Sequence, residues 1–278
     1  MTVASETGLA AAAADLLRGR TWVALTGAGM STDSGIPDYR GPTSVRATPM
    51  QFSEFTGSAE ARRRYWARSY QGWRRIGQAR PNAGHRALAA LERPGGLTGI
   101  ITQNVDRLHQ AAGSRAVIDL HGDIATVVCL DCGARSPRLE MQRRLAALNS
   151  DVPPPVLLDH AELRPDGDAV VERWSDFVLA DCQHCGGPLK PDVVFFGESV
   201  PRDRVDRAYA YVDAADVLVV LGSSLTVMSG LRFVRHSAKA GRPVVIITRG
   251  PTRGDELATL KVEAGCSETL AILAAATG

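Results

Sequence analysis

A chain of 278 residues exceeds a typical single domain of about 100–200 residues, which indicates one large domain with a smaller module. Its formal net charge of +2 argues against a nucleic-acid-binding protein held by bulk electrostatic attraction. No apolar stretch approaches the ~20 residues that span a bilayer, and an acidic residue precedes the first arginine, unlike in a signal or transit peptide. We therefore expect a cytoplasmic protein.

Five short, nearly continuous apolar runs predict strands that are buried on both faces of a parallel sheet. These runs are residues 21–25, 98–102, 116–120, 215–222 and 243–248. Helix-like segments, such as 82–93 and 205–214, lie between them, and the alanine-rich N-terminal segment predicts an amphipathic helix. The alternation of strands and helices predicts an α/β fold with a doubly wound, Rossmann-like parallel sheet.

Two stretches interrupt this alternation. Residues 42–80 are polar, arginine-rich and aromatic, and predict a helical insertion. Residues 124–196 carry four paired cysteines and a proline-rich segment, and predict a second insertion. We expect a larger domain made of 1–41, 81–123 and 197–278, with the two insertions forming a smaller lobe.

The paired cysteines form two C-x₂-C motifs, Cys129 with Cys132 and Cys182 with Cys185, each followed by glycine. In a cytosolic chain, this spacing favours metal binding over disulfides, and four thiolates typically hold one structural zinc ion. Because the protein would fill all four positions, we expect a closed, non-catalytic zinc ribbon. Zinc ribbons also bind nucleic acid, but the sequence around these motifs is only mildly basic and lacks the basic–aromatic surface that such binding needs. We therefore expect no nucleic-acid partner.

Polar residues follow four of the predicted strands. The first strand leads into TGAGMSTDSGIPDYRG (26–41), and the second into TQNVDRLH (102–109). DLHGD (119–123) and LGSSL (221–225) end two others. Ligands of open α/β sheets bind at the carboxyl ends of the strands, so these clusters are expected to converge on one crevice. A dehydrogenase is disfavoured, because the first loop departs from G-x-G-x-x-G and no ribose-binding acid follows at the usual spacing.

Together these stretches resemble the sirtuins, the NAD-dependent protein deacylases, over roughly residues 15–270. The resemblance includes the paired cysteines and KPDVVFFGE (190–198). Segments such as YWARSYQGW (65–73) and GPTRGDELATLK (250–261) look like the class II branch, which includes the fourth human sirtuin. The resemblance implies NAD as co-substrate and acylated-lysine proteins as substrates, with the acyl group transferred to ADP-ribose and nicotinamide released. We expect a monomer that does not bind membranes.

The resemblance also implies which residues bind NAD. The small loop residues after the first strand would lie against the diphosphate, and the residues after them would close over the nicotinamide ribose. The implied contacts are Gly27, Ala28, Gly29, Ser31, Ile36, Pro37, Asp38, Arg40, Gln103, Asn104, Asp106, Gly222, Ser223, Ser224, Thr248, Arg249 and Cys266. Many sirtuins have an asparagine where this chain has Thr248, so the adenosine contacts depart from the usual pattern.

For catalysis, His121 matches the general base of the family, and Asn104 would orient the ribose or a water molecule. The acyl-lysine tunnel would be lined by the segment Val193, Val194, Phe195, Phe196, Gly197 and Glu198, which also reads as a core strand. The other histidines, including His85 and His109, are expected to be packed or solvated.

Two questions stay open from the sequence. Tyr65 and Arg68 have the spacing of a pair that binds acidic acyl groups, but the alignment with Trp66 puts that pair elsewhere, so neutral acyl groups are favoured. The same NAD site could also serve protein mono-ADP-ribosyl transfer, which is the alternative activity.

Overall fold

The protein is described here from a computed structural model, over residues 6–38, 49–93, 96–152 and 174–277. Its helices are α1 (Glu6–Leu17), α2 (Phe52–Gly57), α3 (Ala59–Gln78), α4 (Ala83–Glu92), α5 (Leu108–Ala111), α6 (Arg138–Leu148), α7 (Arg202–Asp213), α8 (Met228–Lys239) and α9 (Cys266–Thr277). Its strands are β1 (Trp22–Thr26), β2 (Leu97–Thr102), β3 (Val117–Asp119), β4 (Gly122–Cys129), β5 (Arg135–Pro137), β6 (Leu189–Val193), β7 (Val217–Leu221), β8 (Val244–Ile247) and β9 (Leu260–Val262).

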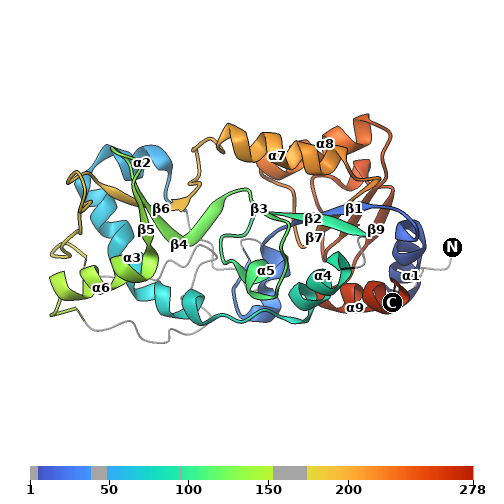
Figure 1. Cartoon of the computed structure of the whole chain (residues 1–278), viewed down its shortest axis with the longest axis horizontal. Coiled ribbons are helices and arrows are strands. Elements are labelled where there is room, and N and C mark those ends of the chain that lie inside the picture. The colour runs from blue at the N-terminus through green and yellow to red at the C-terminus, as the bar shows by residue number, and fades with distance from the viewer. Residues whose placement is uncertain (1–5, 39–48, 94–95, 153–173, 278) are drawn as a thin grey trace.

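Six strands form one parallel sheet in the order β3-β2-β1-β7-β8-β9. Helices cover both faces, with α7 and α8 on one and α1, α4 and α9 on the other (Figure 1). Alternate residues of β1 pack into the hydrophobic cores on the two faces of the sheet. Trp22 and Ala24 lie on the side of α1 and α9, and Val23 and Leu25 lie on the side of α7 and α8. This burial of every residue explains why the strand reads as a continuous apolar run.

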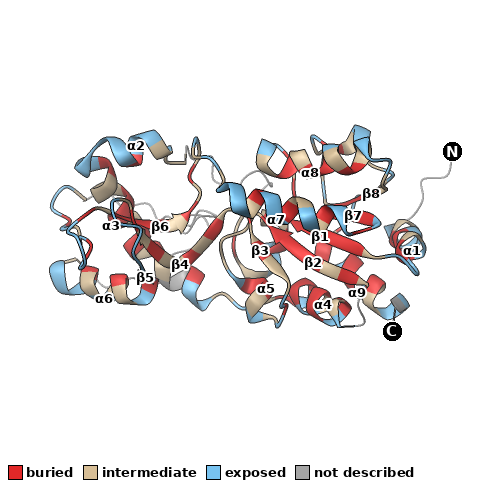
Figure 2. Ribbon diagram, turned by 45° about the horizontal axis from the view of Figure 1, so that its top comes forward, coloured by how far each residue is buried: buried red, intermediate tan, exposed pale blue. Residues whose placement is uncertain are grey.

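The smaller lobe contains an antiparallel sheet in the order β5-β4-β6, covered by α3 and α6 (Figure 2). Its core encloses Arg138, whose guanidinium lies 4.8 Å from the ring centre of Trp66 and 5.0 Å from that of Trp73. The same guanidinium donates to the hydroxyl of Ser69 at 3.0 Å and to its carbonyl at 2.9 Å. Cation–π contacts and hydrogen bonds compensate for burying this charge.

The doubly wound fold and the five predicted strands are confirmed. The strand β9 was missed, because its three residues include Lys261 and it pairs only along one edge, with β8. The exact boundaries between the larger domain and the two insertions stay a prediction. Within the described residues, no helix is long and apolar enough to cross a membrane.

Candidate active site

The order of the parallel sheet reverses between β1 and β7, and the loops that leave these strands meet at its carboxyl edge. Gly27 donates from its backbone N–H to the carbonyl of Leu221 at 3.0 Å, and Gly29 donates to that of Gly222 at 2.9 Å. Such a reversal is where ligands bind in open α/β sheets. The first loop contains two single 3₁₀ turns, Ala28–Met30 and Thr32–Ser34.

The glycines of these two loops are required by contact between the loops themselves. A Cβ added to Gly27 would lie 2.8 Å from the Cβ of Ser223, and one added to Gly29 would lie 3.0 Å from the Cα of Gly222. Gly222 has φ +60°, and an added Cβ would lie 2.5 Å from the backbone nitrogen of Met30. The resemblance places these small residues against the diphosphate of NAD, where small side chains leave room for it. Backbone-to-backbone packing is a second reason.

The residues that follow β2 join these loops through side-chain hydrogen bonds. The amide nitrogen of Asn104 donates to the carbonyl of Gly27 at 2.9 Å and to the hydroxyl of Ser31 at 3.1 Å. The Ser31 hydroxyl in turn donates to Asp106 at 2.7 Å. The side chain of Gln103 donates to the hydroxyl of Ser223 at 2.9 Å. Polar groups from three strand ends therefore form one cluster.

Asp106 is the acidic member of this cluster. Burial raises the pKa of its carboxyl, against the opposing effect of hydrogen bonds from the Leu108 backbone and the Ser31 hydroxyl. A buried carboxyl beside a side-chain amide offers both an acceptor and, when protonated, a donor. Such a carboxyl can match a carboxamide, which presents a carbonyl oxygen and an NH₂ group side by side.

His121 lies between β3 and β4, where the chain passes from the larger sheet to the smaller lobe. Its Nδ1 lies 2.9 Å from the carbonyl oxygen of Gln103, which can only accept, so Nδ1 carries the proton. Its Nε2 lies 2.8 Å from the hydroxyl of Ser229, and as an unprotonated nitrogen it accepts from that hydroxyl. Burial lowers the pKa of His121 to about 4. The imidazole is therefore neutral near pH 7, with a basic nitrogen on one defined side.

Ser229 is a candidate site residue that the sequence analysis did not identify. It lies in the first turn of α8, and nothing in the sequence VMSGL distinguishes it from an ordinary helix-start serine.

The segment predicted to line the acyl-lysine tunnel lies beside His121. Val194 donates its backbone N–H to the carbonyl of His121 at 2.8 Å, so the two connections between the lobes are paired. Only Val193 belongs to a strand, and the residues from Val194 to Glu198 form a turn in which Gly197 has φ +79°. Phe195 is buried, whereas Val194 and Phe196 are half-buried.

A buried ion pair fixes this turn. Lys190 lies 3.1 Å from the carboxylate of Glu198, and it also donates to the carbonyls of Pro191 and Val193. The same Glu198 oxygen accepts the backbone N–H of Phe195 at 2.8 Å. The lysine therefore connects β6 with the turn that follows it.

Other predicted NAD contacts follow β8 or lie further along the loops after β1 and β7. Thr248 follows β8, and Arg249 is an exposed partner of Glu268 at 3.1 Å. Ile36 is buried, Pro37 and Asp38 are half-buried, and the hydroxyl of Ser224 lies 3.1 Å from that of Thr226. Arg40 lies outside the described residues.

Cys266 is buried at the start of α9, and its sulfur lies 3.8 Å from the carbonyl oxygen of Ile247. Burial raises the pKa of its thiol to about 12, so this cysteine is a packed residue and not a reactive nucleophile.

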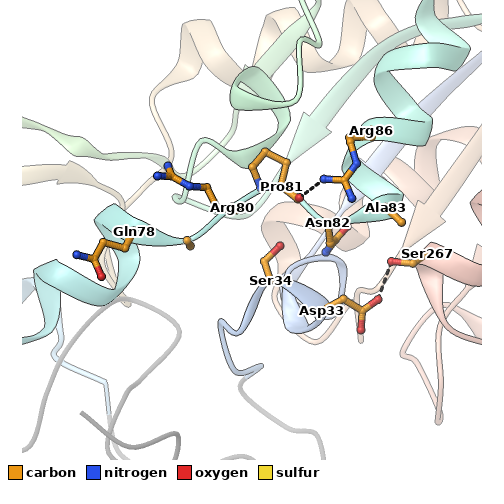
Figure 3. A pocket seen from close by; sticks show the side chains of 10 residues that line it. Asp33, Ser34, Gln78, Arg80, Pro81, Asn82, Ala83, Arg86 and Ser267 are labelled. Atoms are coloured by element: carbon orange, nitrogen blue, oxygen red, sulfur yellow. Dashed lines mark hydrogen bonds between the residues drawn. The ribbon is translucent and has the colours of Figure 1, made fainter. Parts of the chain in front are cut away.

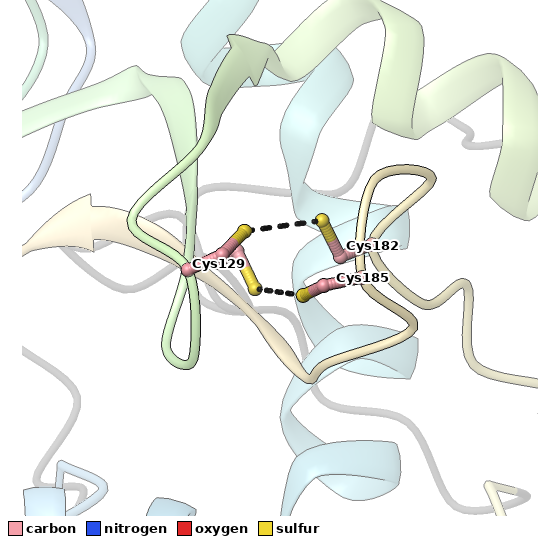
Figure 4. A group of neighbouring side chains, drawn as sticks. Cys129, Cys182 and Cys185 are labelled. Atoms are coloured by element: carbon pink, nitrogen blue, oxygen red, sulfur yellow. Dashed lines mark hydrogen bonds between the residues drawn. The ribbon is translucent and has the colours of Figure 1, made fainter.

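The four paired cysteines come together in the smaller lobe (Figure 4). Their sulfur atoms all lie within 4.8 Å of one another, with Cys129 and Cys185 at 3.5 Å and Cys132 and Cys182 at 3.8 Å. Zn–S bonds of about 2.3 Å put the sulfurs of a tetrahedral site about 3.8 Å apart. Backbone N–H groups of His184 and Gly187 point at two of the sulfurs, both at 3.4 Å. The cluster therefore fits one structural zinc ion.

A cavity of about 590 Å³ opens between the second 3₁₀ turn of the first loop and the connection from α3 to α4 (Figure 3). Its lining includes Asp33, Asn82 and Arg86, and neither His121 nor Asn104 takes part. Asp33 accepts a hydrogen bond from Ser267 at 2.6 Å at its edge. The cavity is thus adjacent to the polar cluster but separate from the residues around His121.

The model of the Sir2 family matches residues 27–229. The chain is 56% identical over 265 residues to the NAD-dependent protein deacetylase 1 of Mycobacterium avium (strain 104), covering 93% of this chain and 92% of that protein. It is 57% identical over 253 residues to the NAD-dependent protein deacetylase 1 of Streptomyces coelicolor, with coverage of 90% and 83%.

Solved structures with similar folds include Sir2 with a p53 peptide and NAD⁺, at a TM-score of 0.74 and 33% identity over 92% of this chain and 93% of that one. A Sir2 variant with a deacetylated p53 peptide and 3′-O-acetyl ADP ribose has a TM-score of 0.75 and 32% identity, with coverage of 95% and 96%.

Proposed function

The chain belongs to the Sir2 family, and we propose that it is an NAD-dependent protein-lysine deacylase that transfers the acyl group to ADP-ribose and releases nicotinamide. One observation carries this proposal: the loops after β1, β2 and β7 form one polar cluster, and a neutral His121 lies beside it. The relatives named as NAD-dependent protein deacetylases and the Sir2 complex with acetyl ADP ribose support the same activity.

The comparisons bear out the family but not the class II branch. The curated relatives are bacterial deacetylases, and they fit bacterial sirtuins rather than class II.

NAD supplies the ribose carbon that receives the acyl oxygen, and nicotinamide is its leaving group. Asp106 would hold the carboxamide and Asn104 the ribose, since the carboxyl and the amide offer matching acceptors and donors. The loops around Gly27 and Gly222 would lie against the diphosphate. Thr248 and Arg249 would contact the adenosine half from the end of β8.

His121 would act as the general base toward a ribose hydroxyl. The carbonyl of Gln103 fixes the ring through Nδ1, which leaves Nε2 to take the proton. Ser229 donates to that nitrogen in this structure, so its hydroxyl must turn away when a substrate hydroxyl binds. The carbonyl of Gln103 also stabilises the imidazolium that forms, because it accepts from the opposite side of the ring.

The half-buried Val194 and Phe196 would face the acyl-lysine, with nearby backbone pairing the substrate peptide as an added strand. The ring of Phe195 packs against those of Phe55 and Tyr65, with centroids 5.1 Å apart in both pairs. These rings belong to the packed core that supports the segment. Acetyl and longer neutral acyl groups stay favoured over succinyl on the sequence alignment around Trp66.

Mass spectrometry of products from NAD and peptides carrying acetyl, propionyl, succinyl, long-chain or lipoyl groups on lysine tests the proposal. Free lysine together with O-acyl-ADP-ribose would establish deacylation, and kcat/KM for each peptide would give the acyl preference. Consumption of NAD without free lysine would overturn it, as would intact NAD with every peptide. Transfer of ADP-ribose to protein, which the comparisons do not support, would appear as a mass increase on the protein. A cytoplasmic location, a monomeric state and the absence of nucleic-acid binding stay predictions.

A further inference from the structure

Two histidines that the proposed mechanism does not use are buried against each other behind the polar cluster. His85 of α4 is 0% exposed and His109 of α5 is 1% exposed, and their ring centres lie 4.8 Å apart. The helices that carry them lie side by side (Figure 1). Both were expected to be packed or solvated, and their burial shows that they are packed. Burial alone does not explain their hydrogen bonds.

One end of this pair is fixed by the start of α4. Nδ1 of His85 lies 3.3 Å from the backbone nitrogen of Asn82, and a backbone N–H can only donate. Nδ1 is therefore unprotonated, and the neutral ring carries its proton on Nε2. Asn82 accepts the backbone N–H of His85 through its side chain at 3.1 Å, and its NH₂ group donates to the carbonyl of Met30 at 2.8 Å. Figure 3 shows Asn82 beside the loop that carries Asp33 and Ser34.

The other end is fixed by the ends of β1 and β2. The hydroxyl of Thr26 donates to that of Thr102 at 2.9 Å, which also accepts the backbone N–H of Asn104 at 3.1 Å. Thr26 has no second proton to give. Nε2 of His109, 3.0 Å from the same Thr26 oxygen, must therefore be the donor in that contact. In the neutral ring of His109, Nδ1 is then the unprotonated nitrogen.

The two nitrogens left over are complementary. Nε2 of His85 and Nδ1 of His109 are both buried and have no hydrogen-bond partner among the described residues. The first is a donor and the second an acceptor. Burial lowers the pKa of His85 to about 4 and that of His109 well below its ordinary value, so both rings are neutral near pH 7.

We propose that His85 and His109 are positioning residues, with Nε2 of His85 donating to Nδ1 of His109 through one water molecule. Every donor then points the same way along one chain of hydrogen bonds from Asn82 to Thr102. This chain connects the loop held at Met30 with the backbone of Asn104. Hydrogen bonds that run head to tail strengthen one another, and a buried network that is fully satisfied holds one arrangement. The role rests on the proposed function, because its effect on NAD depends on Asn104.

The tautomers can be tested without turnover. Two-dimensional ¹H–¹⁵N spectra of the full-length protein with ¹⁵N-labelled histidine distinguish protonated from unprotonated ring nitrogens. Near pH 7 we expect both rings to be neutral, with the proton on Nε2. The variants His85→Asn and His109→Gln assign the two signals, each by losing one. A proton on Nδ1 of either ring, or a charged ring, would overturn the proposal.

The positioning effect is tested by kinetics. In His85→Asn, the amide oxygen keeps an acceptor near the place of Nδ1 for the backbone N–H of Asn82. In His109→Gln, the amide nitrogen keeps a donor near the place of Nε2 for Thr26. Each variant therefore interrupts only the link between the two rings. We expect each to lower kcat/KM for NAD by about threefold to tenfold, the effect of one hydrogen bond, with KM for the acyl-peptide unchanged. The double variant should lower kcat/KM for NAD no further than the more damaging single variant does, because both substitutions break the same chain of hydrogen bonds.

His236→Gln is the matched control, since His236 is part of an exposed contact with Asp213. The positioning role would be overturned if the losses of kcat/KM from the two single variants multiplied in the double variant. It would also be overturned if KM for the acyl-peptide changed as much as kcat/KM for NAD. An inactive wild-type protein with the expected tautomers would instead count against the proposed function.

Discussion

His121 holds its Nδ1 2.9 Å from the carbonyl oxygen of Gln103. This contact joins the short connection between β3 and β4 to the residue that follows β2, the neighbour of β3 in the sheet. It sets the tautomer of the ring, because a carbonyl can accept only from a protonated nitrogen. The basic nitrogen is therefore directed by the backbone of the next strand, at the point where the chain leaves the larger sheet.

Replacing His121 by alanine should lower kcat by about 10²–10⁴-fold, the usual contribution of a general base. Binding of NAD, measured by calorimetry, should change little. Because burial lowers the pKa of His121 to about 4, kcat/KM of the wild-type enzyme should stay level as the pH falls to about 5 and drop as it approaches 4. An acid limb centred near the ordinary pKa of ~6.5 would contradict a His121 that is neutral down to about pH 5.

Stability should depend on pH through His85 and His109. Their pKa values are lowered in the folded state by burial, and unfolding restores them to ~6.5. The unfolded state then binds more protons below that value, so the stability present above pH ~6.5 is lost as the pH falls toward 4. Each histidine should contribute about 1.4 kcal/mol per pH unit to the slope of the unfolding free energy over this window. Urea titrations at several pH values give the unfolding free energy of the wild type and of His85→Asn. Between pH 4 and 6.5 the slope of this free energy against pH should be smaller in the variant by the equivalent of about one proton. Equal slopes would contradict a lowered pKa of His85.

Zinc should bind in a ratio of one ion per chain and hold the smaller lobe together. The four cysteines draw together β4, the turn after it and the segment before β6, so Cys132→Ser should abolish binding and loosen that lobe. Emission spectrometry gives the metal content, and hydrogen exchange should show faster exchange in β4 to β6 with the six-stranded sheet still protected. Full protection of β4 to β6 without metal would show that the ion is not structural.

Cysteine labelling separates the cluster from the fifth thiol. Chelation should make Cys129, Cys132, Cys182 and Cys185 reactive toward a thiol reagent. Cys266 should stay unlabelled until the protein unfolds, because burial raises the pKa of its thiol to about 12. Peptide mapping by mass spectrometry identifies the labelled sites, and early labelling of Cys266 would contradict its packed role.

Alanine substitutions at two glycines with similar backbone angles separate the cost of a left-handed backbone conformation from the cost of pushing the two loops apart. Gly222 has φ +60° and Gly241 has φ +71°, but an added Cβ at Gly241 meets no atom within 4 Å. Gly241→Ala should therefore cost only about 1–2 kcal/mol of unfolding free energy for the left-handed conformation. Gly222→Ala should cost more and should also weaken NAD binding, because its Cβ would lie 2.5 Å from the nitrogen of Met30. Equal costs would mean that the two loops separate easily.

Much of the fold could be predicted from the sequence. Strands buried on both faces, such as β1 and β7, must be apolar at every position, so their presence and parallel pairing could be inferred from local composition. The cysteine motifs predicted a four-sulfur cluster because two residues between thiols suit a metal knuckle. The short strand β9 gave no such signal, since three residues are stabilised mainly by pairing with β8.

The family, the α/β architecture and the candidate residues at strand ends could be inferred from the amino-acid sequence, because those features depend on residue types and short spacings. Three further features are visible only in the folded chain: the tautomer of His121, its contact with Ser229 and the pairing of His85 with His109. These depend on atoms brought together across separate strands and helices, where a carbonyl, a hydroxyl or the loss of water sets the protonation of a ring. A neutral histidine with one defined basic nitrogen is a property of its surroundings, and no local pattern in the chain contains it.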